Sequence, residues 1–194
     1  MTEAKTASAC SGTDFVAAWT QAGWERVAIR SAALSREKGM EPLVFTTEKN
    51  VKRFIWNLTA NVGPAQPNKL EDVHFVQLSY YAMANNAKNP PRPELRAIYA
   101  AVKPGAAFTG REDDPLIRAI RAHQKARGGM QDGRISVMRG NFYHMSDGPH
   151  TFMVTALNNN LVDMMPDDYP RLDKHPICPQ AVRDAVRSHC LPPG

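Results

Sequence analysis

The stretch 114–129, DPLIRAIRAHQKARGG, carries the clearest structural signal in this chain and predicts a helix over 115–127. Asp114 followed by Pro115 is typical of a helix start, because the Asp side chain accepts hydrogen bonds from free N–H groups and Pro lacks an N–H that has no helical partner there. Gly128 and Gly129 end the segment, as glycine commonly does after the last helical residue. Helical periodicity recurs along most of the chain, which favours a mainly helical domain.

The predicted helix has an apolar face and a cationic face, because residues three and four positions apart share one side of a helix. This spacing groups Leu116, Ile120 and His123 on one side, and Arg118, Arg121 and Lys125 on another. The acids of the segment, Asp113 and Asp114, stand at its start and do not neutralise the cations from within. The row of cations therefore suggests an anionic partner.

Composition predicts a soluble globular protein of about one domain. The chain has 194 residues, 43% hydrophobic and 22% charged, and these proportions are ordinary for a folded domain. Its 24 Lys and Arg exceed its 19 Asp and Glu, so the formal charge of +5 mildly favours anionic surfaces. No apolar run approaches the roughly 18 residues of a membrane helix, and the first residues lack the apolar core of a signal peptide. A cytoplasmic protein without a membrane partner is therefore expected.

We predict an α+β fold, mainly helical, in a single domain of about six helices with a small antiparallel β element in the C-terminal third. Residues 1–12 are expected to form an N-terminal arm and residues 13–194 the globular domain. Helical periodicity marks 14–37, 47–62, 93–102, 115–127 and the segment after Pro179. Residues 70–84 are apolar on both sides, so they fit a buried strand or a buried helix, and their length favours a helix.

Two regions have the composition of strands. Leu43-Val44-Phe45 is a short apolar run that fits a single strand. The alternating residues from 134 and the β-branched and aromatic run 151–157, joined through Asp147-Gly148, predict two paired strands near 134–157.

The leading functional hypothesis is a non-enzymatic module that binds a polyanion, with nucleic acid, RNA or DNA, as the favoured partner. Each cation that contacts a phosphate releases condensed counterions, and guanidinium groups suit bidentate phosphate contacts. The helix contains no aromatic side chain, so base stacking is not expected from it. The competing interpretation is a solvated helix face that serves solubility. The predicted binding residues are Arg118, Arg121, Lys125, Arg127, Lys52 and Arg53.

The alternative is an enzyme. DVHFVQLSYY at 72–81, a loop, the helix PELRAIYAAV at 93–102, Lys103-Pro104-Gly105 and the apolar restart at 106–108 resemble the fourth strand, the following helix and the fifth strand of a class I methyltransferase. The resemblance implies an S-adenosylmethionine site at the C-terminal end of a strand at 72–80. A helix at 70–82 would exclude it. A further alternative is a structural protein that self-assembles on nucleic acid, with the exposed loop NNAKNPPRP at 85–93 as the contact between copies.

Residues 141–178 are dense in polar and aromatic groups but poor in regular patterns. Long irregular stretches tend to be functional or mobile, so any small-molecule pocket is predicted to be lined from here, with His144 and His150 as its titrating groups. The competing and favoured interpretation is a surface strap. These histidines lack the spacing of a metal motif, and the sequence predicts neither a metal site nor a cofactor. The strap would be held against the core by Met164, Pro166, Tyr169 and Leu172.

Three cysteines, Cys10, Cys178 and Cys190, fit no zinc-ribbon spacing and are expected to be free thiols. Cys10-Ser11-Gly12 ahead of a predicted helix resembles the nucleophile of NlpC/P60-type cysteine peptidases, because a helix N-terminus lowers the pKa of a thiol. This resemblance implies His74 as the base. An inert thiol on an N-terminal arm is the competing interpretation.

Overall fold

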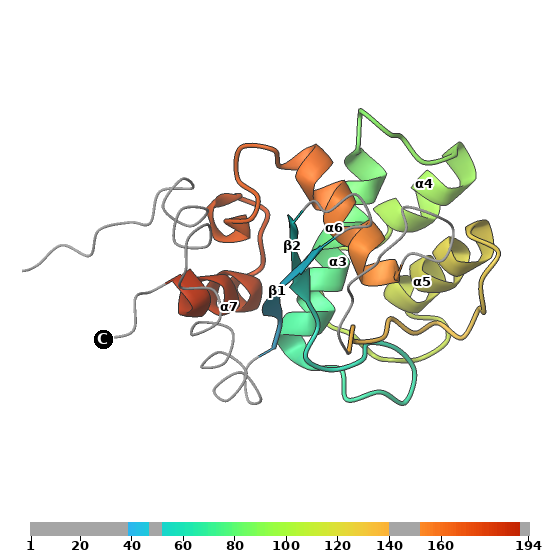
Figure 1. The fold of residues 1–194 in the computed structure, drawn as a ribbon. Coiled ribbons are helices and arrows are strands. Elements are labelled where there is room, and N and C mark those ends of the chain that lie inside the picture. Colours follow the sequence, from blue (N-terminus) through green and yellow to red (C-terminus); the bar gives the residue numbers. More distant parts are fainter. Residues whose placement is uncertain (1–38, 47–51, 140–151, 191–194) are drawn as a thin grey trace, which may run out of the picture.

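The computed structural model of the chain describes residues 39–46, 52–139 and 152–190 (Figure 1). Within these ranges the fold is mainly helical with one small antiparallel sheet, which confirms the predicted class. The elements are β1 (Glu41–Thr46), β2 (Lys52–Asn57), α3 (Leu70–Asn85), α4 (Pro93–Ala100), α5 (Pro115–Ala126), α6 (Met153–Met164), the 3-10 turn η1 (Leu172–Lys174) and α7 (Gln180–Cys190). The part of the chain that is described thus has five α-helices, not the predicted six, and its sheet lies in the N-terminal half instead of the C-terminal third. The helix expected at 14–37 lies outside it, and the division into residues 1–12 and 13–194 stays a prediction.

The sheet is the hairpin of β1 and β2, whose antiparallel register pairs Glu41 with Asn57. The short strand expected at Leu43-Val44-Phe45 is confirmed, but the helix expected at 47–62 is wrong, because β2 occupies 52–57. Ile55, Trp56 and Asn57 are all buried in succession, so both faces of β2 are covered. Apolar residues on both faces of a strand imitate helical spacing, and this explains the error.

The pair of strands expected near 134–157 is also wrong. Ile135 forms only an isolated antiparallel bridge with Val62, and Met153–Met164 is the helix α6. The buried residues of α6 include Val154, Leu157, Asn158 and Leu161, which have helical spacing. Because Asn158 interrupts the apolar pattern, that face is hidden in the sequence, and packing onto α3 outweighs β propensity.

Helix α3 is the central element and packs against α4, α6 and α7. Eleven of its 16 residues are buried, which accounts for its lack of an amphipathic pattern. The helical interpretation of 70–84 is confirmed. The methyltransferase resemblance needed a strand at 72–80, so it finds no support in the described residues, whose sheet has two strands.

Asp72, buried in the first turn of α3, ties the hairpin to this helix. Its carboxylate accepts hydrogen bonds from the backbone N–H groups of Met40 (2.8 Å), Thr59 (3.2 Å) and Ala60 (2.8 Å), and from the Thr59 hydroxyl (3.2 Å). Burial raises the pKa of Asp72, although these four hydrogen bonds oppose the shift.

The segment after α6 returns to the hairpin as a strap. Asn158 exchanges two hydrogen bonds of 2.9 Å with the backbone of Trp56, and the Tyr169 hydroxyl donates to Phe54 O and to Asn158 Oδ1. The Trp56 indole N–H donates to Pro170 O at 2.9 Å. Leu172, a residue of the strap itself, is fully buried, whereas Pro166 is exposed and does not hold the strap. No described helix is long and apolar enough to cross a membrane.

Candidate functional site

The predicted cationic helix is confirmed as α5. The Asp114 carboxylate accepts from Leu116 N (2.9 Å) through one oxygen and from the backbone N–H and hydroxyl of Thr109 (2.8 and 2.9 Å) through the other. This cap fixes the first turn of α5 on the preceding loop. The buried residues of α5 are Leu116, Ile117, Ala119, Ile120, His123 and Gln124, so the opposite face is left to the cations.

The cations of α5 differ in what they contact. Arg118 and Lys125 are exposed, and neither makes an ion pair with any residue that the structure describes. Arg121 is partly neutralised by Glu112, because its guanidinium lies 2.7 Å from a carboxylate oxygen. Its Nε is buried without a hydrogen-bond partner in the described part of the chain. Of the three cations predicted on the exposed face of α5, Arg118 and Lys125 are thus the two available to a partner.

The other predicted binding residues lie elsewhere. Arg127 follows α5 as its C-cap, is half-buried, and its charge helps to lower the pKa of His123. Lys52 and Arg53 belong to β2, where they pair with Thr46 and Phe45, and their side chains lie outside the described residues. β2 packs against α6, whereas α5 packs against α4. The structure therefore does not add Lys52 and Arg53 to the α5 surface.

Positive charge is concentrated in the segment 86–139, which contains α4 and α5. It has 11 Lys and Arg against 5 Asp and Glu, an excess of six, whereas the whole chain has an excess of five. The rest of the chain is therefore close to neutral. In Figure 1, α4 and α5 lie together at the side of the molecule opposite α7. We call this the α4–α5 surface, and its two helices carry the cations Arg96, Arg118, Arg121 and Lys125.

An aromatic cluster anchors α5 to α3 and α4. His123 lies 3.3 Å from the Tyr80 hydroxyl through Nδ1, and its ring centroid is 6.2 Å from that of Tyr99. His123 is buried, and burial together with the charge of Arg127 lowers its pKa to about 4. Burial also raises the pKa of Tyr80 well above its usual value. The imidazole is therefore neutral at pH 7 and acts as a packing residue beneath the cationic face.

A small hollow of about 200 Å³ lies between α4 and α5. It is lined by Ala97, Ile98, Ala101, Pro115 and Arg118. Since no aromatic ring lines it, the hollow offers aliphatic contact but no platform for base stacking. Arg118 is thus a cation at the edge of an apolar hollow.

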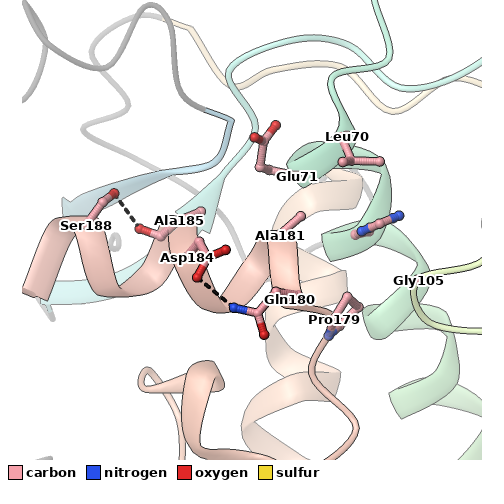
Figure 2. A pocket seen from close by; sticks show the side chains of 10 residues that line it. Leu70, Glu71, Gly105, Pro179, Gln180, Ala181, Asp184, Ala185 and Ser188 are labelled. Atoms are coloured by element: carbon pink, nitrogen blue, oxygen red, sulfur yellow. Dashed lines mark hydrogen bonds between the residues drawn. The ribbon is translucent and has the colours of Figure 1, made fainter.

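A larger pocket of about 710 Å³ lies between α3 and α7, away from the cationic helix (Figure 2). It is lined by Leu70, Glu71, His74, Gly105, Pro179, Gln180, Ala181, Asp184, Ala185 and Ser188. The Asp184 carboxylate accepts a hydrogen bond from the Gln180 side chain at 2.8 Å. His74 Nδ1 is buried with no hydrogen-bond partner in the ranges that the structure describes. Burial lowers the pKa of His74, and the charge of Glu71 opposes this shift.

This pocket is not where the sequence analysis expected one. His144 and His150 lie outside the described residues, so their pocket stays a prediction. The α3–α7 pocket is lined by Leu70 and Ser188, which are more than one hundred positions apart in the sequence. No local sequence pattern indicates that two such distant residues line the same pocket. The acids Glu71 and Asp184 stand in two different helices and belong to no local motif, so sequence reasoning missed them.

Of the three cysteines, the structure describes the side chain of Cys178 alone. Cys178 is a free, buried thiol, as expected, and burial raises its pKa to about 12, so it is no nucleophile. Cys10 and the side chain of Cys190 lie outside the described residues. The described ranges hold no group of three or more His, Cys, Asp or Glu side chains arranged for a metal ion.

Comparison of the chain with protein-family models, with curated proteins and with solved structures gave no match. Functional inference therefore rests on the residues and contacts described above.

Proposed function

We propose that this protein is a polyanion-binding module whose partner is nucleic acid and whose binding surface is the α4–α5 surface. The observation that carries the proposal is the pair Arg118 and Lys125, two exposed cations of α5 that have no ion-pair partner among the described residues. They lie in a segment whose positive excess is larger than that of the whole chain. A phosphate backbone complements such a surface, because each contact releases condensed counterions.

The expected mode of binding is contact with phosphates rather than reading of bases. The hollow next to Arg118 is aliphatic, α5 has no Phe, Tyr or Trp, and its one ring, that of His123, is buried. Without a stacking platform or a row of base-reading amides on the helix, affinity should depend little on nucleotide sequence. The interaction should therefore be strongly weakened by salt.

The test is binding of a labelled oligonucleotide of arbitrary sequence, single- or double-stranded, over a salt series. The informative variant is Lys125→Glu, with Lys174→Glu as its matched control, because both lysines are exposed and both changes alter the net charge equally. Lys174 lies in η1, which packs against α7 at the other side of the molecule. We expect Lys125→Glu to weaken binding several-fold and to reduce the salt slope by about one, and Lys174→Glu to do neither.

Two results would contradict the proposal. If no binding is seen at low salt, or if affinity is indifferent to salt, phosphate contacts are absent. If Lys125→Glu and Lys174→Glu weaken binding equally, the effect comes from net charge and not from α5. The alternative form of the proposal is that several copies of the protein assemble on one nucleic-acid molecule. Light scattering with and without nucleic acid distinguishes this assembly from binding by a single copy.

A further inference from the structure

Arg121 is the central cation of the row on α5, and a carboxylate of the same chain occupies it. Arg118 stands three positions before Arg121 and Lys125 four positions after it, so the three follow one side of the helix. With a rise of about 1.5 Å per residue, both neighbours lie within roughly 6 Å of Arg121 along the helix axis. A polyanion that contacts Arg118 and Lys125 together must therefore pass over Arg121.

Glu112 contacts the Arg121 guanidinium with both of its carboxylate oxygens. One oxygen lies 2.7 Å from Nη1, and the other accepts a hydrogen bond from Nη2 at 2.8 Å. A guanidinium binds a phosphate in the same bidentate way, because a phosphate also presents two oxygens to two parallel N–H groups. The side chains of Arg121 and Glu112 are 40% and 65% exposed, so an anion from solution can reach this pair.

The Arg121 guanidinium is held in position from the side that faces the protein. Its Nε is buried without a hydrogen-bond partner among the described residues, and it lies 3.1 Å from where a Cβ at Gly133 would stand. The backbone at Gly133 is fixed in turn, because its N–H donates to the Gln124 side chain at 2.9 Å. A guanidinium that is already fixed loses little conformational freedom when it binds an anion, and this favours the contact.

Glu112 is held less firmly than the cation that it contacts. It belongs to the loop before α5, and its side chain makes no hydrogen bond or ion pair with any other residue that the structure describes. An exposed ion pair contributes little free energy, because water screens the two charges. A phosphate that is held in place by neighbouring cations can therefore displace the carboxylate.

We infer that the Arg121 guanidinium is a phosphate-binding fork of the α4–α5 surface, which Glu112 occupies in the free protein and from which a phosphate of the partner displaces it. This inference rests on the proposed function, which supplies the phosphate. It makes Arg121 a third phosphate contact beside Arg118 and Lys125. It also makes Glu112 an internal competitor that lowers the affinity for the partner.

The test is binding of the labelled oligonucleotide to the full chain and to Glu112→Gln over the same salt series. Glu112→Gln keeps the size of the side chain and removes its charge, so it should lower the Kd about two- to fivefold, the factor that an exposed ion pair is worth. Glu94→Gln is the matched control. Glu94 is exposed on α4 and makes no ion pair with a described residue, so its replacement removes the same charge without releasing Arg121. It should lower the Kd by a smaller factor.

A double-mutant cycle with Arg121→Met separates the fork from the net charge. Methionine keeps an unbranched apolar stem against Gly133 but has no N–H group, so Arg121→Met should raise the Kd several-fold and reduce the salt slope by about one. In the Arg121→Met protein, Glu112→Gln should change the Kd no more than Glu94→Gln does, because no fork is left to release.

The possible results distinguish this inference from the proposed function. If the wild type binds but Glu112→Gln and Glu94→Gln lower the Kd equally, net charge explains the effect, and the inference is overturned while the proposed function stands. An equal effect of Glu112→Gln with and without Arg121 would overturn the inference in the same way. If neither the wild type nor Glu112→Gln binds at low salt, both are refuted. Binding by Glu112→Gln alone would support occupation of the fork by Glu112 and refute binding by the wild type.

Discussion

The buried imidazole of His123 predicts a specific loss of stability in acid. Its pKa is about 4 in the folded protein, whereas an exposed histidine has a pKa near 6.5. About one unit above pH 6.5 the imidazole is neutral in both states and contributes no pH dependence. As the pH falls below 6.5, the unfolded chain takes up the proton first, and stability decreases until the folded protein is also protonated near pH 4.

The size of the effect follows from these two pKa values. At pH 5 the unfolded histidine is almost fully protonated and the folded one almost fully neutral, so the contribution of His123 to the free energy of unfolding should be about 2 kcal/mol lower than at pH 7.5. Tyr80, Tyr99 and Arg127 surround the ring, and none of them changes its charge over this interval. The contribution therefore belongs to His123.

Urea unfolding of the wild type and of His123→Phe, followed by circular dichroism from pH 7.5 to pH 5, measures this contribution. The variant keeps a ring in the cluster but leaves the Tyr80 hydroxyl without its partner, so it should be less stable at pH 7.5 by about 1–2 kcal/mol. Since all other titrating groups are shared, the wild type should lose about 2 kcal/mol relative to the variant by pH 5, so that the difference between the two proteins vanishes or changes sign. Parallel curves of stability against pH would refute the reasoning.

Three further substitutions test contacts that stabilise the fold around α5 and α7, each through the free energy of unfolding in urea. Asp173→Asn removes the charge that pairs with the buried Arg171 guanidinium at 2.8 Å and should lower stability by about 3–5 kcal/mol; a change below 1 kcal/mol would mean that water replaces the carboxylate. Gly63→Ala should lower stability by more than about 2 kcal/mol, because φ is +146° and the new Cβ would lie 2.6 Å from Gly133 O; wild-type stability would show that this close approach is absent. Asp114→Ala should lower stability by about 1–2 kcal/mol through loss of the α5 cap, with hydrogen exchange increasing first at the start of α5; unchanged exchange there would contradict the role of the cap.

The sequence predicted the helices whose ends are marked locally. The α5 boundaries follow from Asp114-Pro115 and Gly128-Gly129, and the start of α4 follows from Pro93. These signals depend on the backbone chemistry of a few neighbouring residues, so they are independent of what packs against the helix. The cationic face of α5 could be predicted for the same reason, since it is a pattern within one helix.

The errors arose where burial on several sides removed the periodic pattern. β2 is covered on both faces and was taken for a helix, and α6 has Asn158 within its buried face and was taken for a strand. In both segments the decisive contact is long-range: Asn158 and Trp56 meet across 102 positions through two hydrogen bonds. An asparagine in an otherwise apolar run cannot be recognised as a core residue until its backbone partner is known.

The position of His123 links the two faces of α5. Its neutral ring packs against Tyr80 and Tyr99, while Arg118 and Lys125 extend from the exposed face. Protonation would place a charge within the cluster that fixes α5 on α3 and α4, and this would loosen the helix that presents the cations. Yet mild acid also raises the net positive charge of the protein, and this favours the binding of a polyanion. Because bound nucleic acid stabilises only the folded state, the partner should offset the acid loss of stability by an amount that rises with the logarithm of its concentration above Kd.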